Sequence, residues 1–353
     1  MNKPTRHDGK LRFRTHHYPK GSVISSFTWK DRPVLVTGAT GLLGSWVVPE
    51  LVRRGALVVA LVRDSAPHSM LVRDGWLDRI AVVRGSLTDD GLLRRAFAKY
   101  SVDTVFHLAA QTLVGVARMD PVGTLEANVR GTWLLLEAAR QTGVRQVLVA
   151  SSDKAYGDST DLPYLESHPL QGSFPYDVSK SCTDLITTMY ARTYGLRSAI
   201  ARCGNLFGGG DVNFSRLIPG VIRSTLSNEA FLVRSDGKFV RDFLYAQDAA
   251  DAYLMLAQKL ADDDSLIGEA FNFGLGLRPT MIEIVEQALQ QMGRTDLRPV
   301  IQNSASAEIR EQYLSADKAR ERLGWEPRFA MEEGLERTIA WYRAFFADLQ
   351  QGR

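Results

Sequence analysis

Short, wholly apolar runs alternate with longer amphipathic stretches through the first two hundred residues. The apolar runs are Val34 to Val36, 56–62, 80–85, 103–110 and 146–152, and residues at helical spacing lie between them, up to Gly55, near 88–99 and near 121–142. Strands that are apolar throughout are buried on both faces, and strands that alternate with helices form parallel sheets. The pattern predicts an α/β fold, a doubly wound parallel sheet of the Rossmann type.

The rhythm loosens after about residue 205. The segment 204–220 is rich in glycine and loop-like, 235–260 predicts a strand and turn followed by a helix, and the tail from 280 contains two helical stretches separated by LGWEPRF. We interpret this half as a smaller, partly interleaved C-terminal substrate lobe. The predicted division is an N-terminal arm (1–30), a dinucleotide-binding domain (31–204, with 243–278 interleaved) and a substrate lobe (205–242 and 279–350).

Composition narrows the class of protein. Hydrophobic content of 45%, charge of 24% and a net charge of +3 are ordinary for a globular protein, and no basic face of the kind that binds nucleic acid stands out. Cys182 and Cys203 lack the spacing of a disulfide framework or a zinc site, so we expect no metal. The first thirty residues lack a signal-type apolar region and no run suits a membrane span, so we expect a cytoplasmic protein without membrane partners.

Gly38, Gly41 and Gly44 form a GxxGxxG turn between the first strand and the first helix. Such a turn lets the backbone approach a pyrophosphate, which the helix N-terminus then faces. We therefore predict a nicotinamide dinucleotide cofactor, NAD(P). At the end of the second strand, Arg63 could pair with a 2′-phosphate and favours NADP, whereas Asp64 could hold a ribose and leaves NAD open.

The motif YDVSK places Tyr176 and Lys180 four residues apart, on one face of a predicted helix. A tyrosine with an ordinary pKa near 10 is a poor base, and a neighbouring ammonium favours its phenolate. Taken with the glycine turn, this pair indicates a catalytic Tyr–Lys unit.

These motifs in this order, with FHLAAQ, NVRGT and SSDKAYG, resemble the extended short-chain dehydrogenase/reductase superfamily of nucleotide-sugar epimerases and dehydratases, over about residues 33–345. FHLAAQTLV and SSDKAYGD are most similar to the CDP-glucose 4,6-dehydratases. The resemblance implies that Tyr176 takes the proton from the sugar 4-hydroxyl, that Ser152 shares this hydrogen bond and that Lys180 holds the nicotinamide ribose. The cofactor-binding positions it implies, besides Tyr176 and Lys180, are Gly38, Thr40, Gly41, Leu42, Leu43, Gly44, Arg63, Asp64, Ser86, Leu87, Leu108, Ala109, Ala110, Gln111 and Asn128. Ser86 departs from the family, which often has an aspartate there.

Asp153 and Lys154 follow Ser152 directly, where related sugar dehydratases carry an acid and a base. The resemblance implies that Asp153 protonates the departing C6 hydroxyl, and that Lys154 removes the C5 proton or stays charged and stabilises the enolate. A solvated turn is the alternative. Because a 4-epimerase needs only the Ser–Tyr–Lys set, the pair favours a nucleotide-sugar 4,6-dehydratase. A 4-epimerase or related oxidoreductase, and a dinucleotide-binding regulator with a disused site, stay open.

The resemblance implies that the substrate is a nucleotide-diphosphate hexose. Asn205 resembles the family asparagine near the sugar diphosphate, Arg216 and Arg241 could meet phosphate oxygens, and Gln111 could reach the substrate. The buried-looking His107 is assigned to packing of the cofactor pocket. By analogy with the superfamily, the helices near 121–142 and 178–194 predict a homodimer.

Overall fold

A seven-stranded parallel sheet forms the centre of the computed structural model, which describes residues 27–304 and 309–351. Its strands are β1 (Pro33–Thr37), β2 (Leu57–Val62), β3 (Ala81–Arg84), β4 (Thr104–His107), β5 (Gln146–Ala150), β6 (Ser198–Cys203) and β11 (Ala270–Phe273). Their order is β11-β6-β5-β4-β1-β2-β3. The strands after β1 are first added on one side of it and then, from β4 on, on the other, so the strand order reverses between β1 and β4. Ligands of such sheets bind outside the carboxyl ends of the strands at this reversal.

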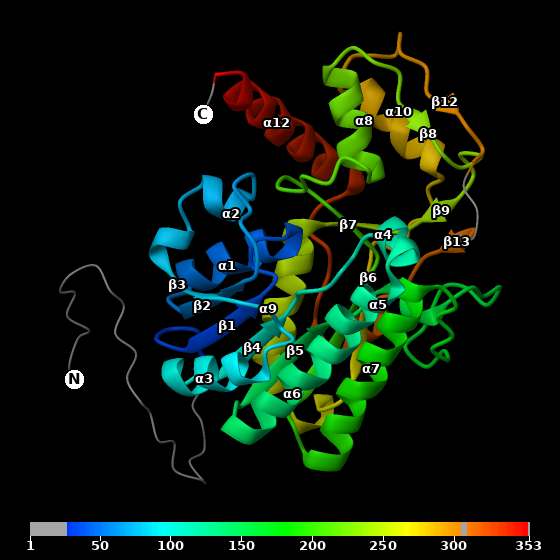
Figure 1. Ribbon diagram of the computed structural model, residues 1–353. Coiled ribbons are helices and arrows are strands. Elements are labelled where there is room, and N and C mark those ends of the chain that lie inside the picture. The colour runs from blue at the N-terminus through cyan, green and yellow to red at the C-terminus, as the bar shows by residue number, and fades with distance from the viewer. Residues whose placement is uncertain (1–26, 305–308, 352–353) are drawn as a thin grey trace.

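Helices cover both faces of the sheet, which confirms the predicted doubly wound fold (Figure 1). Along β1, Val34 and Val36 pack into one core cluster and Leu35 into the other, because successive side chains of a strand point to opposite faces. The first cluster lies under α1 (Leu42–Arg53), α9 (Ala246–Asp262) and α11 (Asp317–Leu323). The second lies under α3 (Asp90–Tyr100), α6 (Gly131–Thr142) and α7 (Pro175–Tyr194).

A third core cluster forms the smaller lobe, built from α8 (Leu217–Leu226), α10 (Met281–Gln291) and α12 (Met331–Gln350) (Figure 1). Three short parallel strand pairs lie outside the main sheet: β7 with β10, β8 with β12, and β9 with β13. Their bounds are β7 (Asn205–Phe207), β8 (Leu232–Val233), β9 (Val240–Arg241), β10 (Phe243–Tyr245), β12 (Val300–Ile301) and β13 (Glu311–Gln312).

Two details differ from the sequence prediction. The tail from 280 holds three helices, α10, α11 and α12, where two were predicted; α10 begins with a capping box in which Thr280 and Glu283 bond each other's backbone N–H groups. The long helix predicted near 121–142 is α5 (Pro121–Leu125), a π-helical turn (Glu126–Arg130) and α6 in succession. The other helices are α2 (Met70–Arg73), α4 (Val114–Met119) and 3-10 turns at Leu77–Arg79, Asp153–Tyr156 and Asp264–Leu266.

Residues outside the predicted boundaries of the dinucleotide-binding domain also pack into its hydrophobic core. Trp29, inside the range predicted as an arm, is buried, and its ring centre lies 5.9 Å from that of Phe106. The arm before residue 27 lies outside the described residues. Leu323, in the range assigned to the substrate lobe, packs into the core of the sheet domain. None of the helices over 27–304 and 309–351 is both long and apolar enough to cross a membrane.

Candidate active site

The glycine turn joins β1 to α1 at the point where the sheet reverses. Gly38 has a φ of +66°, and a Cβ there would lie 2.7 Å from the backbone nitrogen of Ala109. A Cβ on Gly44 would lie 2.2 Å from the carbonyl oxygen of Gly38. Only glycine fits either position, so this backbone can pack tightly around a bound phosphate group.

The N-terminus of α1 fits an anion. Gly41 is its N-cap and supplies no side-chain cap, and the first turn contains no acidic residue. The first N–H groups of a helix lack intrahelical acceptors and carry partial positive charge. The turn and helix therefore suit the pyrophosphate of a dinucleotide.

Replacing Gly38 by alanine is expected to weaken cofactor binding at least about 10-fold, because the new methyl group collides with the backbone of Ala109. Isothermal titration of the cofactor-free protein measures this. Gly75→Ala is the matched control: Gly75 has a φ of +69°, but its Cβ meets nothing within 4 Å. That variant is expected to lose about 1 kcal/mol of stability to backbone strain and to keep its affinity. Equal losses of cofactor affinity in both variants would contradict the idea that the collision with Ala109 weakens binding.

The carboxyl ends of β2 and β3 carry the predicted adenosine-side residues. Arg63 and Asp64 are both exposed and form an ion pair with 2.6 Å between Nε and Oδ2. Ser86 accepts a hydrogen bond from the backbone nitrogen of Thr88 at 3.2 Å and lies 2.9 Å from its hydroxyl. The structure therefore gives Ser86 a role in its own turn, and its contact with a cofactor stays a prediction.

His107, at the end of β4, is buried and neutral and connects Thr37 to Thr132 by hydrogen bonds. Thr132 donates to the carbonyl of Asn128, so it accepts from Nε2 of His107 at 3.0 Å, and Nδ1 then accepts from Thr37 at 3.0 Å. Burial, followed by the charge of Lys180, lowers the pKa of His107 to about 3. The assignment of His107 to packing agrees with these contacts.

The loop after β4 is held by two polar side chains. Thr37 accepts hydrogen bonds from the backbone nitrogens of Leu108 and Ala109, each at 3.1 Å. Asn128, on the π-helical turn, accepts from the backbone nitrogen of Gln111 at 2.7 Å and donates to its carbonyl oxygen and to Ser179, each at 2.9 Å. The carboxamide of Asn128 thus fixes the loop that carries Gln111, and direct contact between Asn128 and a cofactor stays a prediction.

The structure brings Ser152, Tyr176 and Lys180 together beside the end of β5. Lys180 donates to the carbonyl of Ala150 at 2.8 Å, and its Nζ lies 5.9 Å from the centre of the Tyr176 ring. Burial lowers the pKa of Lys180 to about 8, and the charge of Asp184 opposes this. Burial raises the pKa of Tyr176, and a hydrogen bond with Ser152 opposes that shift. Tyr176 therefore needs further positive charge, such as a nicotinamide ring supplies, to act as a base.

Asp153 and Lys154 begin a 3-10 turn directly after Ser152. Ser152 caps this turn, accepting from the backbone nitrogen of Lys154 at 3.2 Å and donating to Oδ1 of Asp153 at 2.9 Å. Asp153 is 1% exposed, and its Oδ2 is buried without a hydrogen-bond partner among the described residues. The burial of Asp153 argues against a solvated turn, because a buried carboxylate oxygen without a partner is costly unless a ligand supplies a donor.

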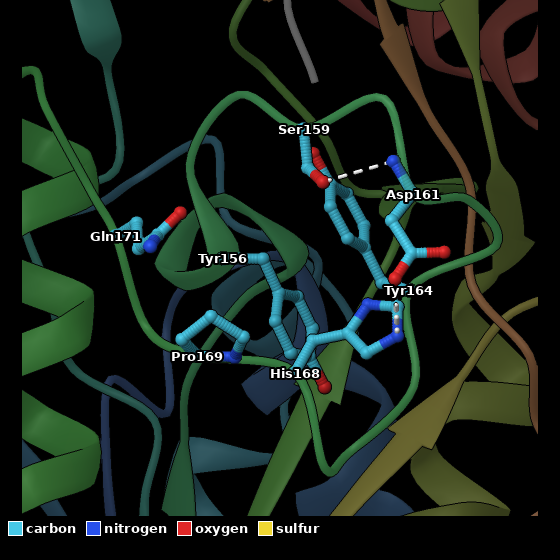
Figure 2. A pocket seen from close by; sticks show the side chains of 7 residues that line it. All are labelled: Tyr156, Ser159, Asp161, Tyr164, His168, Pro169 and Gln171. Atoms are coloured by element: carbon cyan, nitrogen blue, oxygen red, sulfur yellow. Dashed lines mark hydrogen bonds and ion pairs between the residues drawn. The ribbon is translucent and has the colours of Figure 1, made fainter.

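A loop from 157 to 172 supports the far end of this turn. Figure 2 shows Tyr156 and Tyr164 lining a pocket with His168 and Asp161; the two tyrosine rings stack with centres 4.8 Å apart. The hydroxyl of Tyr156 donates to Asn272 at 2.7 Å and accepts from Arg202 at 2.8 Å. The turn is therefore fixed from behind by buried polar contacts.

The predicted substrate residues lie on the side of the smaller lobe. Arg241 is buried and donates to the carbonyls of Val240 and Arg310, at 2.8 and 3.1 Å. Arg216 donates to Asp211 and to the hydroxyl of Thr112, both at 2.9 Å, and its charge opposes the rise that burial causes in the pKa of Tyr176. Both arginines can therefore supply positive charge to a diphosphate next to the catalytic set. Asn205, half-buried on β7, donates its backbone N–H to the carbonyl oxygen of Asp242 at 2.8 Å.

Three residues of the site were missed from the sequence. Asp177 is buried next to Tyr176, and burial raises its pKa to about 6 while Lys154 opposes the shift. Gln312 accepts a hydrogen bond from Lys154. Asp242 accepts from the backbone nitrogens of Leu275, Gly276 and Leu314 at 3.0–3.3 Å, and burial raises its pKa to about 7. Asp177 stands inside YDVSK, and Asp242 directly follows Arg241 in VRDF, so both could have been found there; Gln312 belongs to no motif.

The fold is the Rossmann-type fold of the short-chain dehydrogenase/reductase epimerases and dehydratases. The model of the NAD dependent epimerase/dehydratase family matches residues 34–274, and the chain belongs to this family.

Known proteins of the family include both dehydratases and epimerases. The chain is 31% identical to CDP-glucose 4,6-dehydratase of Salmonella typhimurium, over 92% of this chain and 94% of that protein. Its structure resembles a dTDP-glucose 4,6-dehydratase from Streptomyces venezuelae with NAD bound (TM-score 0.79, 30% identity, 88% of this chain, 97% of that one). It also resembles a Thermotoga maritima UDP-glucose 4-epimerase with UDP-glucose (TM-score 0.81, 27% identity, 89% and 99%). The similarity therefore limits the reaction to these two classes, dehydration and epimerisation of nucleotide sugars, without deciding between them.

Proposed function

We propose that the protein is a nucleotide-sugar 4,6-dehydratase. It oxidises C4 of a nucleotide-diphosphate hexose, removes water across C5 and C6, and returns the hydride to C6 to give a 4-keto-6-deoxy sugar. The observation that carries the proposal is the turn in which the buried Asp153 and the half-buried Lys154 directly follow Ser152. A 4-epimerase has no use for a second acid–base pair at this place.

The residues divide the work by position. When bound, the nicotinamide supplies the hydride acceptor and later the hydride donor. Tyr176 removes the proton of the 4-hydroxyl, Ser152 shares that hydrogen bond, and Lys180 holds the ribose and favours the phenolate. Asp153 protonates the departing C6 hydroxyl. Lys154 either removes the C5 proton as a base or stays charged and stabilises the enolate.

Product mass tests the proposal. The purified protein with its bound cofactor is incubated with CDP-, GDP-, dTDP- and UDP-hexoses. Loss of one water from one sugar, without net accumulation of reduced cofactor, is the expected result and names the substrate. Isomerisation at unchanged mass would instead establish the 4-epimerase.

The preference for NADP stays a prediction, and Arg63 alone supports it. The family is described as NAD-dependent, and the exposed guanidinium of Arg63 is paired with Asp64 at the end of β2. Mass spectrometry of the cofactor released on denaturation decides between NAD and NADP.

A homodimer is part of the proposal, supported by exposed apolar side chains on neighbouring helices. Met119 on α4 is 81% exposed, Val122 on α5 70% and Leu185 on α7 60%. Apolar patches of this kind mark interaction sites. Leu185→Glu is expected to convert a dimer to a monomer in light scattering coupled to size exclusion. Leu232→Glu, at a 50% exposed leucine on β8, is the matched control and is expected to stay dimeric. A dimer in both variants would rule out this helix face.

A further inference from the structure

Gln312, on β13, touches a candidate catalytic side chain far from it in the sequence. Its carboxamide oxygen accepts a hydrogen bond from Nζ of Lys154, 158 residues earlier in the chain. Gln312 is fully buried, whereas Lys154 is half-buried. The contact therefore links the turn after β5 to a strand at the border of the smaller lobe.

The chain at Gln312 and Tyr313 is fixed from two sides. On one side, the carbonyl oxygen of Gln312 accepts from the backbone nitrogen of Asp242 at 3.0 Å, and β13 pairs with β9 so that Gln312 stands opposite Arg241. On the other side, the backbone nitrogen of Tyr164 donates to the carbonyl of Tyr313 at 2.9 Å. A side chain on a segment that is hydrogen-bonded on two sides has little freedom to move. Such a side chain suits the task of holding a catalytic group in place.

Charged groups face Lys154 from several elements, and Gln312 adds an acceptor without adding a charge. Asp153 lies on the same turn, Asp177 on α7 and Arg241 on β9; both Lys154 and Arg241 act on the pKa of Asp177. Asp242, Tyr164 and Tyr176 also face this cluster, since the charge of Asp153 acts on the pKa of each. An amide oxygen accepts from an amine and from an ammonium alike, whereas a carboxylate would stabilise the ammonium.

We propose that Gln312 is a positioning residue, which holds the nitrogen of Lys154 at the place where the C5–C6 proton chemistry occurs. The inference rests on the proposed dehydratase function. Gln312 acts through Lys154 and has no role in the oxidation of C4.

The first test is Gln312→Met, which keeps the length of the side chain and removes the hydrogen-bond acceptor. The expected result is a fall in kcat for water loss of about 10- to 100-fold with KM within about threefold, because a misplaced proton-transfer group loses rate and not binding. C4 oxidation, followed as transient absorbance of the reduced nicotinamide, is expected to persist. Water loss within twofold of the wild type would overturn the inference.

A double variant separates positioning from a general structural effect. In a Lys154→Met background, Gln312→Met is expected to change the remaining rate less than twofold, because residues that act as one unit give non-additive effects. The same 10- to 100-fold loss in both backgrounds would show that Gln312 acts independently of Lys154 and would overturn the inference.

The second test, Gln312→Glu, keeps an acceptor and reads the pH profile. A carboxylate beside Lys154 favours its ammonium form, so the limb of the kcat profile that belongs to Lys154 is expected to move about one unit to higher pH. Movement of the acid limb identifies Lys154 as the base, and movement of the alkaline limb identifies it as the charged stabiliser. Gln290→Glu makes the same change at an exposed position on α10 and is expected to leave the profile unchanged. A profile that does not move in Gln312→Glu overturns the inference.

The wild-type protein distinguishes the two levels of failure. If it oxidises C4 and never eliminates water, the dehydratase proposal fails and this inference fails with it. If it eliminates water and Gln312→Met does so at the same rate, only the inference fails. Bound cofactor and the thermal midpoint report whether Gln312→Met is folded; if it is not, Gln312→Glu decides.

Discussion

Replacing Tyr176 by phenylalanine is expected to lower kcat about 10³-fold, because positioned acid–base groups contribute about 10²- to 10⁴-fold. The substitution removes only the hydroxyl, which is the sole group on Tyr176 that can take the proton of the 4-hydroxyl. Every later step needs the C4 ketone, so C4 oxidation, C5 exchange and water loss are all expected to fall together. Cofactor binding is expected to change less than about threefold, since Lys180 stays in place.

Single-turnover absorbance of the reduced nicotinamide, combined with product mass, measures this loss. Tyr190→Phe is the matched control, because Tyr190 lies on the same helix, α7, and packs into the second core cluster. That variant is expected to turn over like the wild type. Normal C4 oxidation by Tyr176→Phe would remove Tyr176 from the chemistry and assign the proton to another group.

The features whose position in the fold could be predicted from the sequence are local. The turn at Gly38, Gly41 and Gly44 and the pair Tyr176 and Lys180 each depend on spacings of three or four residues, and helix or strand geometry converts such spacings into positions. The sheet strands could be predicted because strands buried on both faces are apolar throughout. Even Asp177 lay within reach, since it stands inside the quoted motif.

The features that the sequence could not predict depend on long-range contacts. β13 is only two residues long, so Gln312 has no periodicity around it. Its contact with Lys154 depends on the pairing of β13 with β9 and on the hydrogen bond from Tyr164 to the next residue, Tyr313. Asp242 joins three backbone nitrogens from two distant segments. Helix α10 differs: its capping box, Thr280 and Glu283, was visible in the sequence, so the undercount of helices in the tail was avoidable.

Replacing Asp153 by asparagine is expected to lower the rate of water loss about 100-fold or more while C4 oxidation continues. Asparagine keeps the shape of the buried side chain but has no acidic proton for the departing C6 hydroxyl. Reduced nicotinamide is therefore expected to form transiently and to decay without dehydrated product, by return of the hydride to the C4 ketone. In D2O, exchange of the C5 proton is expected to persist in this variant, whereas Lys154→Met is expected to slow exchange and water loss together.

Stopped-flow absorbance, product mass and deuterium content at C5 measure these three steps on one preparation. Asp158→Asn is the matched control, because Asp158 is an exposed carboxylate only five residues further along the same segment. It is expected to behave like the wild type, since the side chain of Asp158 is exposed to solvent. Water loss at the normal rate in Asp153→Asn would mean that the buried Oδ2 of Asp153 has a structural role. Loss of C4 oxidation as well would place Asp153 with Ser152 and Tyr176 in the first step.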